Sequence, residues 1–238
     1  MTGTDLEAGR ASPGTPPYPS SRLHGRKQGR HLRAGGQYAL EKELPEYAAP
    51  LTGAAAPLGL FSPGTSEIWL EIGFGDGAHL AWTAAAHPHI SFIGCEVFAN
   101  GVVRLLRSIK TQELRNVRIH KGDARVLLSV LPDACLSRVF VLFPDPWPKL
   151  RHHKRRLMQA GTVSALARVM RTGAELRFVS DHAEYFADCL ATLQAHPDFA
   201  LLPQIPRDWP ATAYERKAIA AGRTPQYLRA ARLQAPVR

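Results

Sequence analysis

The chain has few cysteines, no long hydrophobic stretch and two basic segments that contain no acidic residue. Its three cysteines, Cys95, Cys135 and Cys189, are widely spaced and form no Cys-x-x-Cys pair. This pattern indicates neither a disulfide framework nor a zinc site, and a reducing compartment fits best. No apolar run approaches the roughly 20 residues that span a bilayer, and the amino terminus lacks the hydrophobic core of a signal peptide. We therefore expect a cytoplasmic protein with no membrane association and no bound metal.

Acidic residues are absent from two segments in which lysine and arginine gather. The chain carries 30 Lys and Arg against 20 Asp and Glu, which gives a formal net charge of +10. Residues 22–33 and 146–174 contain basic residues and no acid. A positive surplus favours an anionic partner and says nothing about the fold. Two separated basic segments predict an extended basic face.

The first part of the chain differs in composition from the rest. Residues 1 to about 30 are rich in proline, glycine and serine and have almost no large apolar side chains. Such a segment cannot bury enough surface to offset the entropy of ordering it. We predict a disordered basic arm over residues 1–30 and a single folded domain over residues 31–238.

Strand-like and helix-like patterns alternate from residue 67 onward. The patterns predict strands at 67–72, 90–97, 117–120, 139–143 and 175–180, and helices at 78–86, 101–109, 124–131, 157–170 and 182–195. Regular alternation of this kind predicts an α/β fold with a doubly wound, mostly parallel sheet and helices on both faces. After Pro197 the pattern weakens, leaving two short strands near 199–202 and 227–232 around an irregular segment.

A glycine-rich loop joins the first predicted strand to the first predicted helix. It reads Glu71-Ile-Gly73-Phe-Gly75-Asp76-Gly-Ala78, and in a doubly wound sheet this turn faces the ligand crevice. The glycines let the backbone approach a ligand closely, although they could also serve a tight turn alone. The spacing fits the relaxed dinucleotide fingerprint as well. Acids at 71 and 76 disfavour a pyrophosphate and favour a cationic sulfonium with an amino group, S-adenosylmethionine.

Two later acids follow the second and third predicted strands. Glu96 comes after the apolar run 90–94, where a carboxylate can accept both hydroxyl protons of a ribose. The alternative is an exposed acid at a strand end. Asp123 lies where a side chain could reach an adenine amino group, and it could also be the N-cap of the helix that begins at Ala124. Both roles of Asp123 are compatible.

The most unusual motif follows the apolar run 139–143. It reads Phe143-Pro-Asp145-Pro-Trp147-Pro-Lys149-Leu-Arg151-His-His-Lys-Arg-Arg156. One carboxylate, that of Asp145, stands between two prolines beside a tryptophan, and a dense basic stretch follows. This combination suits an active site whose substrate is a polyanion. The alternative is a proline-stiffened turn followed by the solvated start of a helix.

Together these motifs resemble the bacterial tRNA (guanine-N7)-methyltransferase family, whose members are class I S-adenosylmethionine-dependent enzymes. The resemblance runs from about Arg26 to Tyr227 and adds the matches Arg26-Lys-Gln-Gly-Arg30, Gly94-Cys-Glu-Val97 and Thr212-Ala-Tyr-Glu215. It implies a Rossmann-like fold of seven strands, one of them antiparallel near the C-terminus. It also implies methyl transfer from S-adenosylmethionine to N7 of a guanine in the tRNA variable loop, giving 7-methylguanosine, with tRNA as the partner.

The resemblance also implies roles for individual residues. The cofactor-site residues are Glu71, Gly73, Gly75, Glu96, Asp123 and Asp145, with Asp145 also the catalytic residue. The substrate-contacting residues are Lys149, Asp181, Thr212, Ala213, Tyr214 and Glu215. The RNA-contacting residues are Arg151, His152, His153, Lys154, Arg155 and Arg156. The family usually has Lys where this chain has Ala213 and Phe where it has Tyr214, so one expected substrate contact is missing unless Arg216 or Lys217 replaces it.

The implied chemistry explains which residues the sequence does not need. Guanine N7 carries an in-plane lone pair, so its attack on a methyl group requires no proton removal and no protein nucleophile. Asp145 would supply fixed negative charge, while Asp181 and Glu215 could accept the N1 and N2 protons of guanine. Trp147, Trp209 or Tyr214 could stack on the base. Two other interpretations remain: a nicotinamide dehydrogenase leaves the basic stretch unexplained, and a noncatalytic RNA-binding module leaves the glycine loop and its acids unexplained.

Overall fold

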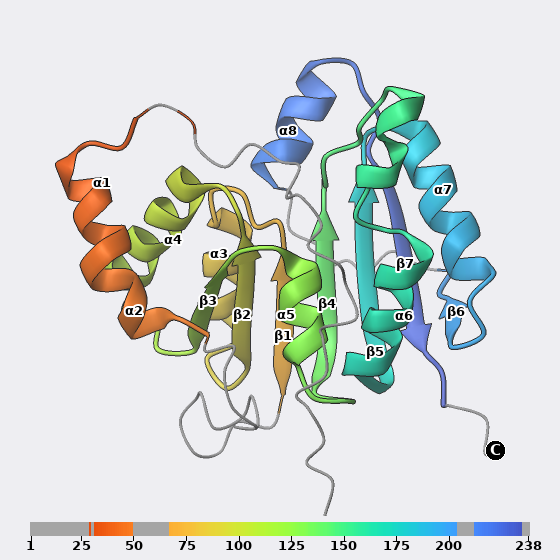
Figure 1. Ribbon diagram of the computed structural model, residues 1–238, viewed down its shortest axis with the longest axis horizontal. Coiled ribbons are helices and arrows are strands. Elements are labelled where there is room, and N and C mark those ends of the chain that lie inside the picture. The colour runs from red at the N-terminus through yellow and green to blue at the C-terminus, as the bar shows by residue number, and fades with distance from the viewer. Residues whose placement is uncertain (1–28, 30, 50–66, 204–211, 235–238) are drawn as a thin grey trace, which may run out of the picture.

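A seven-stranded sheet organises the molecule (Figure 1). The structure is a computed structural model that describes residues 29, 31–49, 67–203 and 212–234, so the predicted arm over 1–30 lies almost wholly outside the described residues. The strand order is β3-β2-β1-β4-β5-β7-β6. The strands are β1 (Ile68–Ile72), β2 (Ser91–Glu96), β3 (Val117–Lys121), β4 (Leu136–Leu142), β5 (Met170–Ser180), β6 (Phe199–Leu201) and β7 (Gln226–Arg232).

The sheet is mostly parallel, as predicted. β1 to β5 pair in parallel, while β7 runs antiparallel to both β5 and β6. Every residue of β1 and β2 is buried, as expected for strands covered on both faces. The predicted single antiparallel strand near the C-terminus is therefore β7, and the seven-stranded Rossmann-like arrangement is confirmed.

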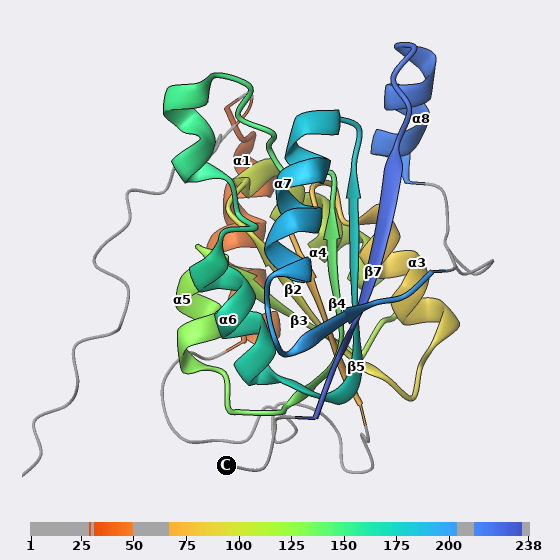
Figure 2. The same cartoon turned by 90° about the vertical axis from the view of Figure 1, so that its right-hand side faces the viewer.

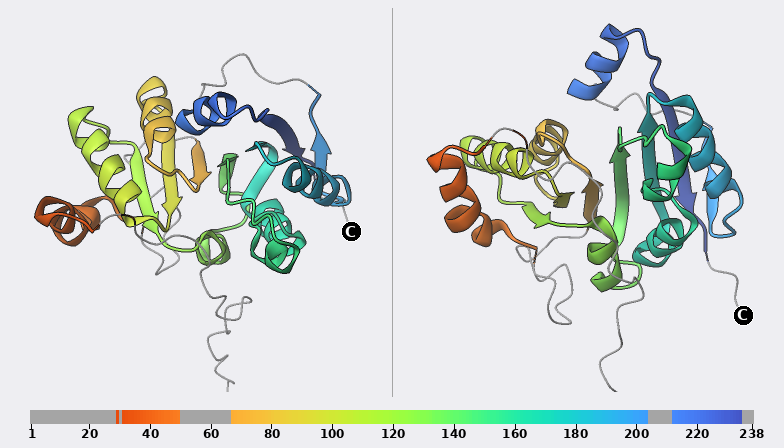
Figure 3. Two further views of the ribbon diagram at one scale, coloured as in Figure 1. Left: turned by 90° about the horizontal axis from the view of Figure 1, so that it is seen from above. Right: turned by 45° about the horizontal axis from the view of Figure 1, so that its top comes forward.

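Helices cover both faces of the sheet (Figure 3). On one face pack α3 (Ala78–Ala86) and α4 (Ala99–Thr111); on the other pack α5 (Ala124–Val130), α6 (Ala160–Val169) and α7 (Ala183–Gln194). Figure 2 shows α3 and α5 on opposite sides of the strands. The buried face of α4 repeats at helical spacing through Val102, Leu105, Leu106 and Ile109. Each such side chain contributes roughly 1.5–3 kcal/mol of burial free energy.

The described part of the N-terminal segment forms a helix that the sequence patterns did not predict. It consists of α1 (Ala34–Tyr38), one π-helical turn η1 (Ala39–Glu43) and α2 (Leu44–Tyr47). The segment packs on α4, where Glu43 accepts a 2.6 Å hydrogen bond from the Lys110 ammonium. Two glycines in its first turn, Gly35 and Gly36, lower the helix propensity of the sequence. Packing against α4 therefore stabilises this helix, and the sequence pattern alone does not predict it.

Several further boundaries and elements differ from the predictions. The helix predicted from Leu157 begins at Ala160, because the preceding residue, Gln159, has an extended backbone with φ −101° and ψ 159°. β5 begins at Met170 rather than Glu175, since α6 passes directly into the strand. The segment predicted to be irregular contains α8 (Ala213–Ala220), and a 3-10 helix, η3 (Leu150–Arg155), carries the basic stretch. No helix in the described ranges is long and apolar enough to cross a membrane.

Candidate active site

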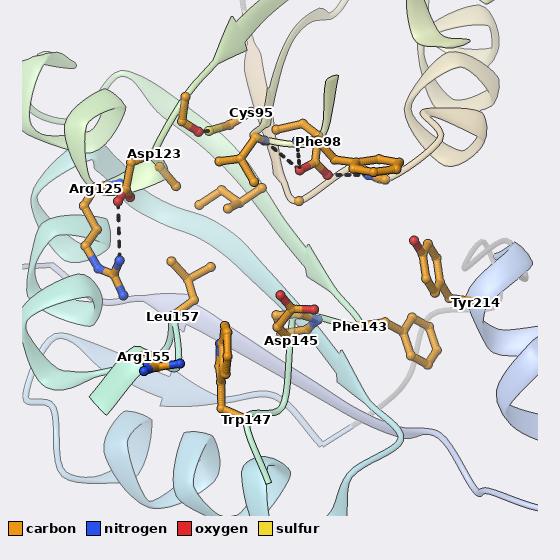
Figure 4. Close-up of a pocket in the computed structure, with 18 residues that line it drawn as sticks. Cys95, Phe98, Asp123, Arg125, Phe143, Asp145, Trp147, Arg155, Leu157 and Tyr214 are labelled. Carbon is orange, nitrogen blue, oxygen red and sulfur yellow. Dashed lines mark hydrogen bonds and ion pairs between the residues drawn. The ribbon is translucent and has the colours of Figure 1, made fainter. Parts of the chain in front are cut away.

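A cavity of about 380 Å³ opens at the carboxyl ends of β1 to β4 (Figure 4). In the strand order, β1 is flanked by β2 on one side and β4 on the other, so the cavity lies where the chain order reverses. Open α/β sheets bind ligands at this position. The wall includes the glycine loop and three of the predicted cofactor-site acids, Glu96, Asp123 and Asp145.

The glycine loop can adopt its shape only with glycine at key positions. Gly75 has a φ of +61° and donates its amide to the Glu96 carboxylate at 2.8 Å. A Cβ on Gly75 would lie 2.9 Å from the Tyr214 ring, and one on Gly101 of α4 would lie 1.8 Å from the Gly75 carbonyl oxygen. The loop is therefore held between α4 and α8, with its backbone exposed to the cavity at Gly73 and Gly75.

Glu96 is a buried acid that organises one wall of the cavity. It is 9% exposed, which excludes the alternative of a solvated strand-end acid. One carboxylate oxygen accepts the amides of Val97 and Phe98 at 2.6 and 2.9 Å, and the other accepts that of Gly75. Burial raises the pKa of Glu96, and the three amide hydrogen bonds oppose that rise.

Asp123 caps α5 at the opposite end of the cavity from Tyr214 (Figure 4). Its Oδ1 accepts the Arg125 amide at 2.9 Å, which confirms the predicted N-cap role. The Arg125 guanidinium lies 3.5 Å from Oδ2, and both side chains line the cavity. The adenine-contacting role of Asp123 remains a prediction.

Glu71 lies behind the glycine loop rather than in the main cavity wall. It is buried, and the Nδ1 atom of His79 lies 2.7 Å from its carboxylate. The two side chains line a smaller adjoining cavity of about 20 Å³, together with Asp76 and Tyr214. Gly73 borders both cavities, so Glu71 is separated from the main cavity by the loop itself.

Asp145 points into the cavity from an unusual turn (Figure 4). Phe143 and Trp147, on either side of it, have φ values of +50° and +46°. Left-handed conformations at non-glycine residues cost on the order of 1–3 kcal/mol each and persist only when surrounding contacts enforce them. The described residues supply no hydrogen bond or ion pair to the Asp145 carboxylate, and burial raises its pKa although solvent still reaches it.

Helix α8 closes one end of the cavity. Tyr214 stacks against Phe143 with ring centroids 6.4 Å apart and an interplanar angle of 22°. Thr212 and Glu215 form a capping box that starts the helix, and Glu215 also accepts a hydrogen bond from the Tyr227 hydroxyl. This box is the signal that sequence inspection could have used to find α8. Ala213 occupies the first helical position.

Asp181 is also engaged within the protein. It accepts a 2.7 Å hydrogen bond from the Arg223 guanidinium. Neither Asp181 nor Glu215 is part of the main cavity wall. Each carboxylate keeps acceptor capacity beyond its protein donors, so the predicted contacts with the guanine edge remain possible.

The side chains of the basic stretch on η3 point in different directions. Lys149, Arg151 and Lys154 are exposed. Arg155 instead turns toward the cavity, with its guanidinium carbon 5.0 Å from the centre of the Trp147 ring, and His152 meets the edge of the same ring at 5.8 Å.

Arg156, one of the six residues predicted to contact RNA, lies in a different environment from Arg151 and Lys154. It is 1% exposed and its guanidinium contacts Asp188 of α7 and the carbonyl of Pro146. A guanidinium buried in this way has no surface to offer an RNA phosphate. Leu157 was also missed, because nothing in its sequence context distinguishes a cavity-lining leucine from a core leucine.

Comparisons with known proteins identify relatives of the chain. A family model described as "Putative methyltransferase" matches residues 65–227. The tRNA (guanine-N(7)-)-methyltransferase of Rhodospirillum rubrum is 45% identical over 224 residues, which cover 89% of this chain and 88% of that protein. The enzyme of the same name from Paramagnetospirillum magneticum is 44% identical over 235 residues, covering 94% and 96%.

Solved structures support the fold. The 16S rRNA methyltransferase KamB superposes with a TM-score of 0.52 at 15% identity, covering 73% of this chain and 95% of that one. An rRNA methylase from Streptococcus thermophilus gives 0.51 at 11% identity, covering 71% and 89%. At these identities the similarity concerns the fold alone.

Proposed function

Since the chain belongs to the tRNA (guanine-N7)-methyltransferase family, we propose that it transfers a methyl group from S-adenosylmethionine to N7 of a guanine in tRNA, giving 7-methylguanosine. The observation that carries this proposal is the 45% identity to the Rhodospirillum rubrum enzyme over nearly the full length of both chains. Membership in a methyltransferase family disfavours both the nicotinamide dehydrogenase and the noncatalytic RNA-binding module. We place the target guanine in the variable loop because the sequence resembles that bacterial family.

The cavity suits S-adenosylmethionine in size and charge. Its volume lies within the roughly 300–1,000 Å³ of small-molecule sites. The carboxylates of Glu96, Asp123 and Asp145 outnumber the guanidinium groups of Arg125 and Arg155 in the wall, a balance that suits a cationic sulfonium ligand. When bound, this ligand supplies an electrophilic methyl group. Glu96 would accept the ribose hydroxyls and Asp123 the adenine amino group, while Gly73 and Gly75 would leave room for the ligand against the backbone.

Asp145 would act through its charge and its fixed direction. The lone pair of guanine N7 attacks without losing a proton, so the protein needs to align the reactants and stabilise positive charge. The Asp145 carboxylate faces the cavity and has no protein donor among the described residues. It is therefore free to interact with the positive charge that moves from the sulfonium to the methylated guanine.

Base selectivity would come from the rim formed by α8 and the end of β5. Asp181 and Glu215 could accept the guanine N1 and N2 protons, a pattern that adenine does not offer. Their present partners, Arg223 and Tyr227, would keep the two carboxylates oriented until a base arrives. Tyr214, 48% exposed at the cavity rim, offers a surface for stacking.

The proposal is tested by incubating the protein with methyl-labelled S-adenosylmethionine and bulk tRNA, digesting the RNA and identifying the labelled nucleoside. We expect 7-methylguanosine as the labelled product. Label in another nucleoside would overturn the assignment of the base or of the position, and no label above a heat-inactivated control would overturn the activity.

A further inference from the structure

The most buried charged side chain next to the site is that of Arg156, the last residue of the basic stretch. Its guanidinium has a partner on every side. Nε donates to the Pro146 carbonyl oxygen at 2.9 Å, Nη1 donates to the Asp188 carboxylate, and Nη2 lies 2.9 Å from His153 Nε2. Its planar face lies over the Tyr185 ring, 5.1 Å from the centroid. These contacts tie the turn that carries Asp145 to helix α7.

The contacts of Arg156 hold a turn whose backbone conformation is intrinsically unfavourable. Phe143 and Trp147 both have left-handed backbones, and Pro146 has no amide to donate. The turn is anchored on one side where the Phe143 amide donates to the Val179 carbonyl at 2.9 Å. On the other side, the contact from Arg156 Nε reaches the residue directly after Asp145.

The acidic side chains around Arg156 bind its guanidinium rather than a free metal ion. Glu184, Asp188 and His153 lie close enough together that their side chains could bind one metal ion. The guanidinium already lies among them, with Nη2 3.6 Å from Glu184. Only a planar fork can bond a carbonyl through Nε and a carboxylate through Nη1 at the same time. The position therefore requires arginine, and lysine would keep the charge but lose one of the two bonds.

From this geometry we infer that Arg156 is a positioning residue for methyl transfer: paired with Asp188, it fixes the Pro146 carbonyl and so directs the Asp145 carboxylate into the cavity. The inference rests on the proposed function, since it assigns Arg156 to the same site. It separates Arg156 from the exposed Arg151 and Lys154, which face solvent on the same segment.

The test compares Arg156→Lys with a matched control, Arg168→Lys. Arg168 also binds backbone and an acid, through the Leu131 carbonyl at 2.8 Å and Asp133 at 2.6 Å, but neither contact reaches the turn that carries Asp145. Assays are run with both variants fully folded by circular dichroism. Arg156→Lys should lower kcat roughly tenfold or more at saturating cofactor and tRNA, whereas Arg168→Lys should keep the parent kcat.

A second readout does not depend on activity. In protein labelled with ¹⁵N-tryptophan, the Trp147 indole resonance, assigned with Trp147→Phe, should shift or broaden in Arg156→Lys and not in Arg168→Lys. Parent kcat with an unmoved Trp147 resonance would overturn the inference. So would equal losses of kcat in both lysine variants. If the parent protein methylates no tRNA, the proposed function fails, while the Trp147 resonance still decides whether Arg156 holds the turn.

Discussion

At the scale of single residues, the proposed catalysis depends on the carboxylate of Asp145, which has no partner among the residues that the structure describes. The other predicted acids are engaged: Glu96 with three amides, Asp123 with Arg125, and Glu71 with His79. Asp145 faces the cavity, and the described residues give it no donor. A charge that the protein leaves unneutralised is available to a cationic ligand and to a cationic transition state.

Asp145→Asn removes that charge and keeps the size of the side chain. If the charge acts on the transition state, kcat should fall about a hundredfold, equivalent to about 2.7 kcal/mol, while tRNA affinity stays near that of the parent. Steady-state kinetics with both substrates varied measure the effect. A loss confined to the Michaelis constant for S-adenosylmethionine would instead assign Asp145 to cofactor binding. Parent turnover together with parent cofactor affinity would leave the turn a purely architectural role.

The same substitution should stabilise the free protein at neutral pH. Burial raises the pKa of folded Asp145 above its ordinary value of 3.8, so the folded state disfavours the ionised form. Below 3.8 the group is protonated in both states and the penalty is absent. The penalty grows as pH rises from 3.8 toward the folded pKa and is complete above that pKa. Asp145→Asn should therefore raise the Tm at pH 7, with a gain that shrinks toward pH 3.8. A lower Tm at pH 7 would contradict this reasoning.

At the scale of elements, the basic 3-10 helix η3 combines two functions that sequence alone could not separate. Composition predicts where cations gather, and it does not predict which way each side chain points. Arg151 and Lys154 are exposed, while Arg156 turns inward because α7 supplies Asp188 and Tyr185 from more than 25 residues later in the sequence. A partner that distant leaves no local signal beside the arginine.

Replacing Arg151 and Lys154 by Ala should weaken tRNA binding through lost phosphate contacts. With roughly 0.7–0.9 counterion released per phosphate, the slope of log affinity against log salt should flatten by about 1.5 units. Arg171→Ala, at the amino end of β5 and paired with Glu67 at 3.0 Å, is the matched control and should keep the parent slope. Filter binding across a salt series measures both. An unchanged slope in the double variant would make η3 a solvated surface helix.

The elements with strong local periodicity were predicted well, and those created by tertiary contacts were not. The parallel strands and α3 to α5 follow from apolar runs, the glycine loop and helical spacing. Helix α8 and the segment α1 to α2 carry weak periodicity, and packing against the glycine loop and α4 stabilises them. In the site, acids at strand ends were predictable because parallel strands end at one edge. Leu157 and the internal role of Arg156 depend on distant contacts.

At the scale of the whole molecule, the fold brings acidic and basic side chains to the same edge of the sheet. Glu96, Asp123 and Asp145 line the cavity, while η3 places cations beside it. The net charge of +10 favours a polyanion, and the acidic cavity within that basic surface favours a small cation. The basic segment 22–33 falls largely outside the described residues, so its predicted contact with RNA stays a prediction.

Binding of S-adenosylmethionine, and not of a nicotinamide dinucleotide, should therefore stabilise the folded protein. S-adenosylmethionine or its demethylated product should raise the Tm, because each binds the folded state only, whereas NAD and NADP should leave it unchanged. Glu96→Ala should reduce the response, since Glu96 is the proposed ribose acceptor. Differential scanning fluorimetry reports all of these effects. Stabilisation by NAD alone would favour a dinucleotide site.

Guanine N7 is the proposed attacking atom, and one substitution in the RNA tests this proposal directly. A tRNA is prepared with 7-deazaguanine at the single methylated position, which replaces N7 by a C–H group and keeps the N1 and N2 protons. Binding of this tRNA should match that of the unmodified tRNA, and methyl transfer from labelled S-adenosylmethionine should fall to background. Undiminished methyl transfer to the 7-deazaguanine tRNA would contradict the account.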